Sequence, residues 1–463
     1  MRSRWGVSVV AVVLLLAALL MPDAHAATPD VTFVDGFGIH VESVTRLSDR
    51  HYHVSVSSAA LGRAVDIRIL VPDDYSDSAA RLPVLYLFHG TSGRASDWVT
   101  NGDAEQATAG LPLIVVMPDA GFDGDGGGWF TNWVDTKTAL GPSQWETFHV
   151  DQLIPWVDAN LRTVASREGR AIAGLSQGGF GSTTYPARHP DLYVSAAAFS
   201  GAPDIDYDPV TAAGATAIID GTAVGLDGVE PDAMFGSRAT DEINWQGHDP
   251  ADLVTNLRGV DVWLYTATGA PGPYDSPTPN PGAAGIELAT HGSTISFVQR
   301  AQQQGVPVHL EDYTYGTHSW PYWARDLREY LVPLMATFAS PAAPPASISY
   351  ESVDKSWTQW DWSVAMQRTA DQQFSAMTGA DRNGFTLQGS GSAGVTTPAF
   401  YAPGATMKVT SLGPLGTSTT EAVVDAGGRL HVSVDLGPDL PTAAPIGVPV
   451  LPPGSATVTI TAA

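Results

Sequence analysis

The chain has 463 residues, 44% hydrophobic and 15% charged, which is enough for two domains with sizeable cores. Its formal net charge of −25 disfavours nucleic acid, phosphate-rich ligands and anionic membrane surfaces as partners. The sequence contains no cysteine, which excludes disulfides and thiolate metal sites.

The first 26 residues have the three parts of a secretory signal peptide. Arg2 and Arg4 supply the positive end, an apolar run covers residues 7–21, and Ala24-His25-Ala26 forms an A-x-A cleavage site. The apolar run is short for a membrane span. We therefore predict that residues 1–26 are removed and that the mature chain is secreted, without a membrane span.

The next segment alternates apolar and polar residues over 51–56 and 65–71, which predicts two strands. His51 and His53 share one face of the first strand. Because no third metal ligand follows nearby, we expect an exposed strand face there and not a metal site.

From residue 83 the pattern changes to continuous apolar runs of strand length, which suit parallel strands covered on both faces. Helical segments such as 145–161 lie between these runs. The alternation predicts a right-handed, mainly parallel α/β sheet whose functional loops leave the C-terminal ends of the strands. The runs cover residues 84–88, 113–117, 171–173, 194–199 and 262–266.

The third run leads into Gly174-Leu175-Ser176-Gln177-Gly178, a G-x-S-x-G pattern at the start of a helix. This is the pattern of a nucleophile elbow, in which a tight strand-to-helix turn projects the serine hydroxyl into a cleft. The flanking glycines permit strained angles and close approach of neighbouring chains. The N–H of Gln177 lies at a helix N-terminus and can face a developing oxyanion. We predict Ser176 as the nucleophile.

Two further loops follow predicted strands. His89-Gly90-Thr91 ends the first, and the loop 119–133 holds Asp123 and Asp125 in a glycine-rich run. These two aspartates resemble half of a calcium loop, but no closing glutamate follows at the required spacing. We expect a mobile cleft loop and no metal.

A nucleophilic serine needs a base, and the base needs an orienting acid. After an elbow serine the base comes last in the chain. His318 lies in a loop between an apolar segment and a helix-like segment, where a base is expected. His291 and His309 remain alternatives, whereas His189 at the end of the elbow helix favours a structural role.

The acid has to follow the last parallel strand, 262–266. Asp275 and Glu287 both satisfy this position, and composition does not choose between them.

Several short motifs occur in the order seen in the antigen 85 mycolyltransferases. Over residues 40–338 the chain therefore resembles the esterase D/antigen 85 branch of the α/β-hydrolases. The resemblance implies an α/β-hydrolase fold and acyl-serine chemistry without a cofactor. The motifs are W-E-T-F at 145–148, G-L-S at 174–176, H-P at 189–190, F-S-G at 199–201 and G-T-H-S-W at 316–320, followed by Tyr322-Trp323.

The resemblance also implies roles for individual residues. The family's acid is a glutamate before a helix with a phenylalanine ten residues later, and Glu287 and Phe297 match this spacing. Glu287 therefore outranks Asp275 as the orienting acid of Ser176 and His318.

The family's oxyanion hole uses two backbone N–H groups, which correspond here to Thr91 and Gln177. A tryptophan beside the family's histidine contributes to its substrate site, and Trp320 matches it. We add Trp133, at the end of the glycine-rich loop, as a second substrate-binding candidate.

The chain departs from the mycobacterial members in three ways. It has His89-Gly90-Thr91 where the family often has D-G-L, it lacks their cysteine pair, and it adds a C-terminal domain. These departures favour a secreted serine esterase acting on a small-molecule, cell-envelope or polysaccharide ester. An acyltransferase that passes the acyl group to a sugar or alcohol is the alternative, and a non-catalytic carbohydrate-binding protein is the third hypothesis.

Residues 340–347 form a Pro/Ala linker between a catalytic domain at 27–339 and a β-rich domain at 348–463. Strand alternation in the second domain predicts a small β-sandwich. We expect Trp360 and Trp362 to share one strand face and to fill the sandwich core, close to Trp357. The alternative is an exposed aromatic platform that stacks on sugar rings.

Overall fold

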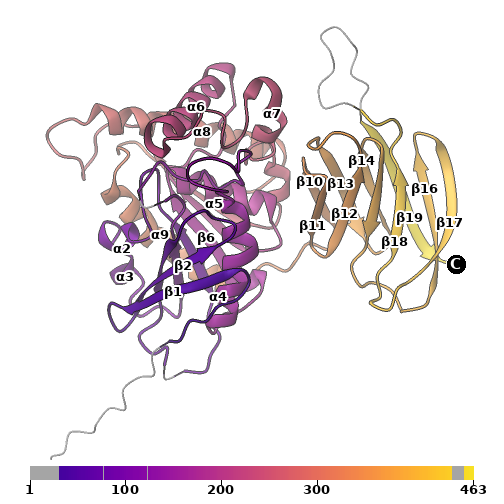
Figure 1. Ribbon diagram of the computed structural model, residues 1–463, viewed down its shortest axis with the longest axis horizontal. Helices are drawn as coiled ribbons and strands as arrows, with labels where there is room; N and C mark the ends of the chain where they lie inside the picture. Colours follow the sequence, from indigo (N-terminus) through magenta and orange to yellow (C-terminus); the bar gives the residue numbers. More distant parts are fainter. Residues whose placement is uncertain (1–30, 77, 123, 441–452) are drawn as a thin grey trace, which may run out of the picture.

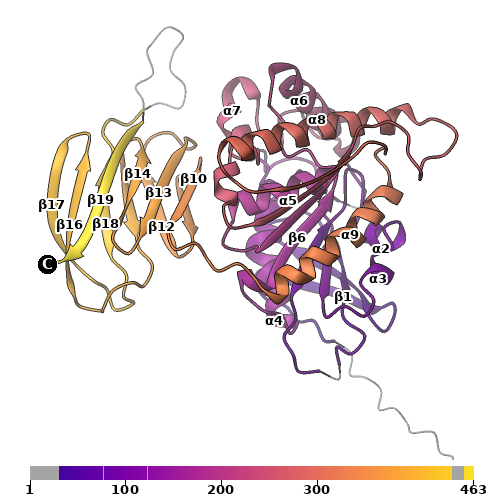
Figure 2. The same cartoon turned by 180° about the vertical axis from the view of Figure 1, so that it is seen from behind.

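The computed structural model describes residues 31–76, 78–122, 124–440 and 453–463. Figures 1 and 2 show a helix-and-sheet body followed by a separate body made of strands alone. The predicted signal peptide and Asp123 lie outside the described residues.

A nine-stranded sheet forms the centre of the first body, in the order β1-β2-β3-β5-β4-β6-β7-β8-β9. The last six strands in this order are parallel, and the first three join them as antiparallel additions. This is the mixed, mainly parallel sheet that the apolar runs predict. The strands are β1 (Ile39–Arg46), β2 (His51–Ser58), β3 (Val65–Leu70), β4 (Val84–Phe88), β5 (Ile114–Pro118), β6 (Arg170–Leu175), β7 (Ser195–Phe199), β8 (Asp261–Ala267) and β9 (His309–Tyr313).

One expectation about β2 is wrong. His51 is buried, with Nδ1 3.7 Å from a carboxylate oxygen of Glu105, and His53 Nε2 lies 2.9 Å from Asp66. Because carboxylates from neighbouring elements lie against both rings, this face of β2 is not an open strand surface.

Helices and short helical turns connect the strands. The segment predicted as one helix at 145–161 consists of a π-helical stretch that continues into an α-helix. The elements are α2 (Asp97–Thr100), α3 (Ala104–Ala107), η1 (Thr147–Leu153), α4 (Ile154–Asn160), η2 (Arg167–Gly169), α5 (Gln177–Arg188), α6 (Pro209–Thr222), η3 (Ala223–Asp227), α7 (Arg238–Gln246), η4 (Val254–Leu257), α8 (Pro281–Gln303) and α9 (Trp320–Ala339).

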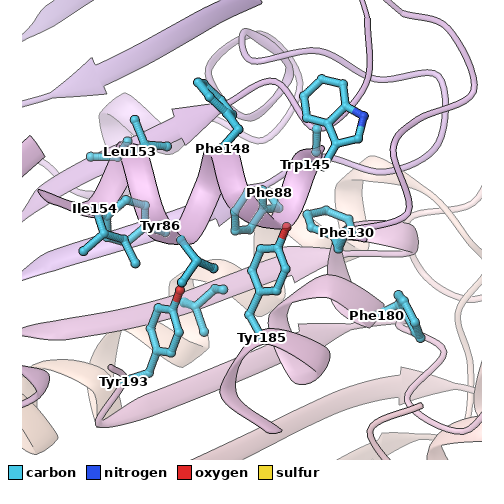
Figure 3. Close-up of a cluster of buried hydrophobic side chains, with 14 of the residues drawn as sticks. Tyr86, Phe88, Phe130, Trp145, Phe148, Leu153, Ile154, Phe180, Tyr185 and Tyr193 are labelled. Carbon is cyan, nitrogen blue, oxygen red and sulfur yellow. The ribbon is translucent and has the colours of Figure 1, made fainter. Parts of the chain in front are cut away.

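Successive side chains of the parallel strands point to opposite faces of the sheet and pack into two cores, one on each face. Tyr86 and Phe88 of β4 point into the core shared with η1, α4 and α5, where Phe88 meets the ring of Phe130 at 4.9 Å (Figure 3). Leu85 and Leu87 point the other way, into the core under α2 and α9. Burial on both faces explains why these strands are continuously apolar and fixes the loops at their ends.

The strands after α9 form two antiparallel sheets. Their inner faces enclose one core that contains Trp357, Trp362 and Leu387. The six-stranded sheet has β10 (Ile348–Ser352), β13 (Ser375–Asp381), β14 (Gly384–Gly389), β19 (Gly454–Ala462), β16 (Thr406–Gly413) and β17 (Gly416–Val423), and the four-stranded sheet has β11 (Ser356–Gln359), β12 (Trp362–Gln367), β15 (Ser392–Thr396) and β18 (His431–Asp435).

The predicted pairing of Trp360 with Trp362 on one strand face is wrong. Gln359 pairs with Trp362 across β11 and β12, so Trp360 and Asp361 are the two turn residues between these strands. Both have positive φ, 52° and 64°, as a type I′ hairpin turn requires. Trp362 is 1% exposed in the core and cannot serve as a platform. Trp360 is half-buried: it packs against the sandwich core, and its ring also lies 5.3 Å from the Arg167 guanidinium of the catalytic body.

The sandwich docks on the C-terminal end of α5. The carbonyl of Arg188 accepts hydrogen bonds from Tyr350 Oη at 2.7 Å and Gln359 Nε2 at 2.9 Å, and its guanidinium lies 3.1 Å from Asp354. A second contact joins η4 to β10 through Asn256, which exchanges two hydrogen bonds with the backbone of residue 351. Buried polar contacts of this kind hold the two bodies together beyond the linker.

Candidate active site

The elbow has the geometry that its glycines predict. Ser176 sits between β6 and α5 with φ 54° and ψ −120°, a backbone conformation that side chains rarely adopt. Its N–H donates to the carbonyl of Phe199 at 2.9 Å. A Cβ at Gly178 would lie 2.3 Å from the carbonyl oxygen of His89, and a Cβ at Gly174 would lie 2.3 Å from that of Gly178. Only glycine fits either position. The close backbone contacts at these glycines fix the turn, and the turn places Ser176 at the end of the sheet.

His318 and Glu287 meet beside this elbow. His318 Nδ1 lies 2.9 Å from Glu287 Oε2, and Glu287 Oε1 accepts hydrogen bonds from Ala267 N at 2.8 Å and Ser200 Oγ at 3.0 Å. The carboxylate is 1% exposed and can only accept, so His318 Nδ1 donates. His318 Nε2 is then the acceptor nitrogen, and it is buried without a hydrogen-bond partner among the described residues.

Ser176 and His318 line one cleft of about 850 Å³. Thr91, Gln177 and Trp320 line the same cleft, and Glu287 lies directly behind His318. The structure therefore brings together every residue predicted for the nucleophile, the base, the acid and the oxyanion side. Helices α6 and α8 contribute mainly small and apolar residues to the remaining wall.

The oxyanion side is built from three loops that are tied together. Gln177 Nε2 donates to Thr91 Oγ1 at 3.3 Å and to the carbonyl of Gly126 at 3.2 Å. His89 lies within 2.8 Å of the Gly90 carbonyl through Nδ1 and of Ala120 N through Nε2. Burial lowers the pKa of His89, which keeps the ring neutral, so that it donates to one loop and accepts from the other.

The alternative residues have other partners. Asp275 accepts from Tyr322 Oη at 2.7 Å and from Gly272 N at 2.7 Å, and it also bonds Thr317 Oγ1. Each alternative histidine pairs with its own carboxylate: His189 with Glu146, His291 with Asp312 and His309 with Asp261. Within the described residues, only Glu287 pairs with His318.

Of the two predicted substrate-binding tryptophans, only Trp320 lines the cleft. Trp133 is 2% exposed and its Nε1 donates to the carbonyl of Gly128 at 3.1 Å, so it packs in the core. Trp129, four residues earlier in the same loop, lines the cleft instead. The prediction for Trp133 is wrong because its ring is buried in the core while Trp129 takes the place at the cleft.

Two residues that support the acid were not predicted. Ser200 has φ 48°, donates to Glu287 Oε1, and accepts from Trp323 Nε1 at 3.2 Å. The ring of Trp323 also meets His318 edge-on at 4.9 Å. A polar residue directly after a buried strand, as Ser200 is after β7, was the available signal.

One group of carboxylates lies beyond the triad. Asp204, Asp206 and Asp249 place ligand oxygens within 4.8 Å of one another. Arg300 lies 3.2 Å from Asp204 and 3.6 Å from Asp206, and burial raises the pKa of Asp249 well above its usual range. The neighbouring arginine and the raised pKa of Asp249 both reduce the negative charge of this group.

Comparison with known proteins identifies a family for this chain. The family model described as "Putative esterase" matches residues 58–334. Esterase Rv1288 of Mycobacterium tuberculosis is 35% identical over 240 residues, which are 50% of this chain and 49% of that protein. The chain thus spans about half the length of this curated relative.

The diacylglycerol acyltransferase/mycolyltransferase Ag85A of M. tuberculosis is 30% identical over 304 residues, covering 64% of this chain and 83% of that protein. Among solved structures, M. tuberculosis MPT51 is 27% identical with a TM-score of 0.48, covering 61% of this chain and 96% of that one. A ferulic acid esterase is 21% identical with a TM-score of 0.46, covering 62% and 97%.

The family match covers more than half of the chain and contains Ser176, Glu287 and His318. The chain belongs to this esterase family.

Proposed function

We propose that the chain is a secreted serine esterase that cleaves carboxylic esters through an acyl-serine intermediate. The observation that carries the proposal is the 2.9 Å pair of His318 and Glu287, because His318 lines the same cleft as Ser176. Membership of the esterase family supports the same chemistry. The sequence of residues 1–26 supports secretion.

In the first half-reaction, Ser176 Oγ attacks the carbonyl carbon of the ester and its proton passes to His318 Nε2. Glu287 accepts the Nδ1–H throughout, holds the ring in place and stabilises the imidazolium that forms. The N–H groups of Gln177 and Thr91 stabilise the oxyanion of the tetrahedral intermediate. When the intermediate collapses, the bond to the alcohol oxygen breaks and the alcohol leaves with the proton from His318.

In the second half-reaction, water attacks the acyl-serine while His318 takes its proton. The carboxylic acid leaves, and the proton returns to Ser176 Oγ. Apart from the ester and water, the steps use only groups of this chain, so the proposal includes no metal and no cofactor.

The second candidate is an acyltransferase, which uses the same residues but lets a hydroxyl of an acceptor replace the water. The similarity to the acyltransferase Ag85A favours it. Hydrolysis and transfer differ in which oxygen reaches the acyl-enzyme first.

Product analysis separates these functions. The wild-type protein and Ser176→Ala are incubated with p-nitrophenyl esters of increasing acyl length, with and without a diacylglycerol or a sugar, and the products are identified by mass spectrometry. An esterase yields free acid under all conditions, whereas an acyltransferase yields the acylated acceptor. A wild-type protein that releases no nitrophenol from any ester would refute both and would support the non-catalytic hypothesis.

A further inference from the structure

The outward face of α6 and η3 has the wrong polarity for a helix exposed to water. Exposed positions recur at three- and four-residue spacing along both elements, yet every one of them is apolar or glycine. Surface helices normally place polar residues on this side. The exposed residues are Pro209, Val210, Ala213, Gly214, Ala217, Ile218, Gly221, Val224, Gly225 and Leu226.

The start of α8 continues this surface. Its exposed residues up to Ala289 are also all apolar or glycine, with Ile286 at 52% and Leu288 at 60% exposure. Helices α6 and α8 lie side by side in both views (Figures 1 and 2) and line the cleft together. We call these exposed residues of α6, η3 and the start of α8 the apolar rim.

The rim lies on the protein and does not form a separate span. The segment Pro209–Asp227 is long and apolar enough, by length and composition, to cross a membrane. Its inner side is nevertheless part of the catalytic body, because Ile219 and Ala223 are buried in the main core. Asp227 at its end accepts a hydrogen bond from Gly126 N at 3.0 Å. The helix therefore keeps its inner side on the body and leaves its outer face exposed.

The position and the charge of the rim define its partner. Ile218 and Ile286 belong to the rim and also line the cleft. A protein seated on the rim would cover this entrance, whereas a layer of amphiphiles would supply ester substrate to it. Residues 189–237 contain no lysine or arginine, and the chain carries a net charge of −25, so anionic headgroups are repelled.

We infer that the apolar rim docks on a lipid surface with zwitterionic or uncharged headgroups, with α6 lying in the interface and the cleft open toward the lipid. The inference rests on the proposed function, because it takes the substrate of the esterase to be an amphiphilic ester in the lipid layer. Docking itself needs no turnover, so the two are tested separately.

The test measures sedimentation of the full chain with large vesicles of phosphatidylcholine. The chain carries Ser176→Ala, so that it cannot hydrolyse lipid during the measurement. In this background Val210→Gln/Val224→Gln changes two rim residues that do not line the cleft. Val332→Gln/Val423→Gln is the matched control, because both valines are comparably exposed elsewhere. We expect the rim variant to lower vesicle partitioning at least about tenfold and the control to change it less than about twofold.

With Ser176 intact, both double variants are expected to hydrolyse a soluble short-chain ester at the wild-type rate. Vesicles of phosphatidylglycerol are expected to bind the Ser176→Ala chain more weakly than vesicles of phosphatidylcholine do. The inference is overturned if the Ser176→Ala chain stays in the supernatant, if both double variants lose binding equally, or if anionic vesicles bind more tightly. A dimer seen by light scattering that the rim variant dissociates would assign the rim to a second copy, which also overturns it. Absence of ester hydrolysis by the wild type would refute the proposed function and leave the vesicle result standing.

Discussion

Glu287 Oε2 lies 2.9 Å from His318 Nδ1, although the two residues are 31 positions apart and belong to different elements. Glu287 is on α8, whereas His318 is in the loop between β9 and α9. The buried carboxylate decides which ring nitrogen carries the proton, and it leaves Nε2 to accept one from the nucleophile.

Replacing this acid tests the relationship. Glu287→Gln can donate an N–H toward His318 Nδ1 and so favours the wrong tautomer, and we expect kcat to fall by about 10²–10⁴-fold. Asp275→Asn is the control, because Asp275 bonds Tyr322 and Gly272 and not His318. Steady-state kinetics on a soluble ester should show near-normal kcat for Asp275→Asn. Equal losses in both variants would contradict the assignment of the acid.

The stability of the protein should depend on pH through Asp227. Burial raises the pKa of this carboxyl from 3.8 to about 7. Between these values the folded chain holds a proton that the unfolded chain has released, so stability falls as pH rises from about 4 to 7. Asp227→Asn has no proton to lose. Its melting temperature relative to wild type should therefore rise between pH 4 and pH 8, by about 2 °C or more. A difference in melting temperature between the variant and the wild type that stays the same across this pH range would contradict the raised pKa of Asp227.

The two tryptophans around the first hairpin of the sandwich should behave differently. Trp362 is 1% exposed in the core, so Trp362→Ala should lower the free energy of unfolding by about 3–5 kcal/mol. Trp360 occupies the turn, is half-buried against the sandwich core and lies 5.3 Å from the Arg167 guanidinium, so Trp360→Ala should cost less, about 1–2 kcal/mol. Denaturant unfolding measures both values, and equal losses would mean that both side chains fill the core.

A fragment of residues 27–340 tests how far the sandwich supports the enzyme. The cleft is at the N-terminal end of α5 and the sandwich docks at the other end, about 18 Å away along the helix. We expect the fragment to hydrolyse a soluble ester within a few-fold of the full chain. It should melt at a lower temperature, because Arg188 loses Asp354, Tyr350 and Gln359. A folded but inactive fragment would show that the sandwich shapes the cleft.

Much of the site could be predicted because its signals are local. The elbow depends on glycines within two residues of Ser176, and β4 to β8 depend on uninterrupted apolar runs, which only strands buried on both faces require. The acid was harder, since Glu287 reaches His318 through the packing of α8. Position after the last parallel strand left Asp275 equal to it, and the family resemblance was needed to favour Glu287.

The errors have physical causes that a single sequence does not display. Trp129 and Trp133 lie in one loop, and only the fold decides which of them reaches the cleft. The turn at Trp360 and Asp361 has a conformation in which asparagine or glycine usually occurs, and neither residue is present to signal it.

The central claim is that Ser176 is the nucleophile. A fluorophosphonate probe reacts with an activated serine, and intact-protein mass spectrometry followed by peptide mapping locates the adduct. We predict one adduct on the wild-type chain, on the peptide containing Ser176. We predict none on Ser176→Ala, together with a loss of turnover of several orders of magnitude. A Ser176→Ala protein that is still labelled or still hydrolyses esters at a near-normal rate would contradict the account.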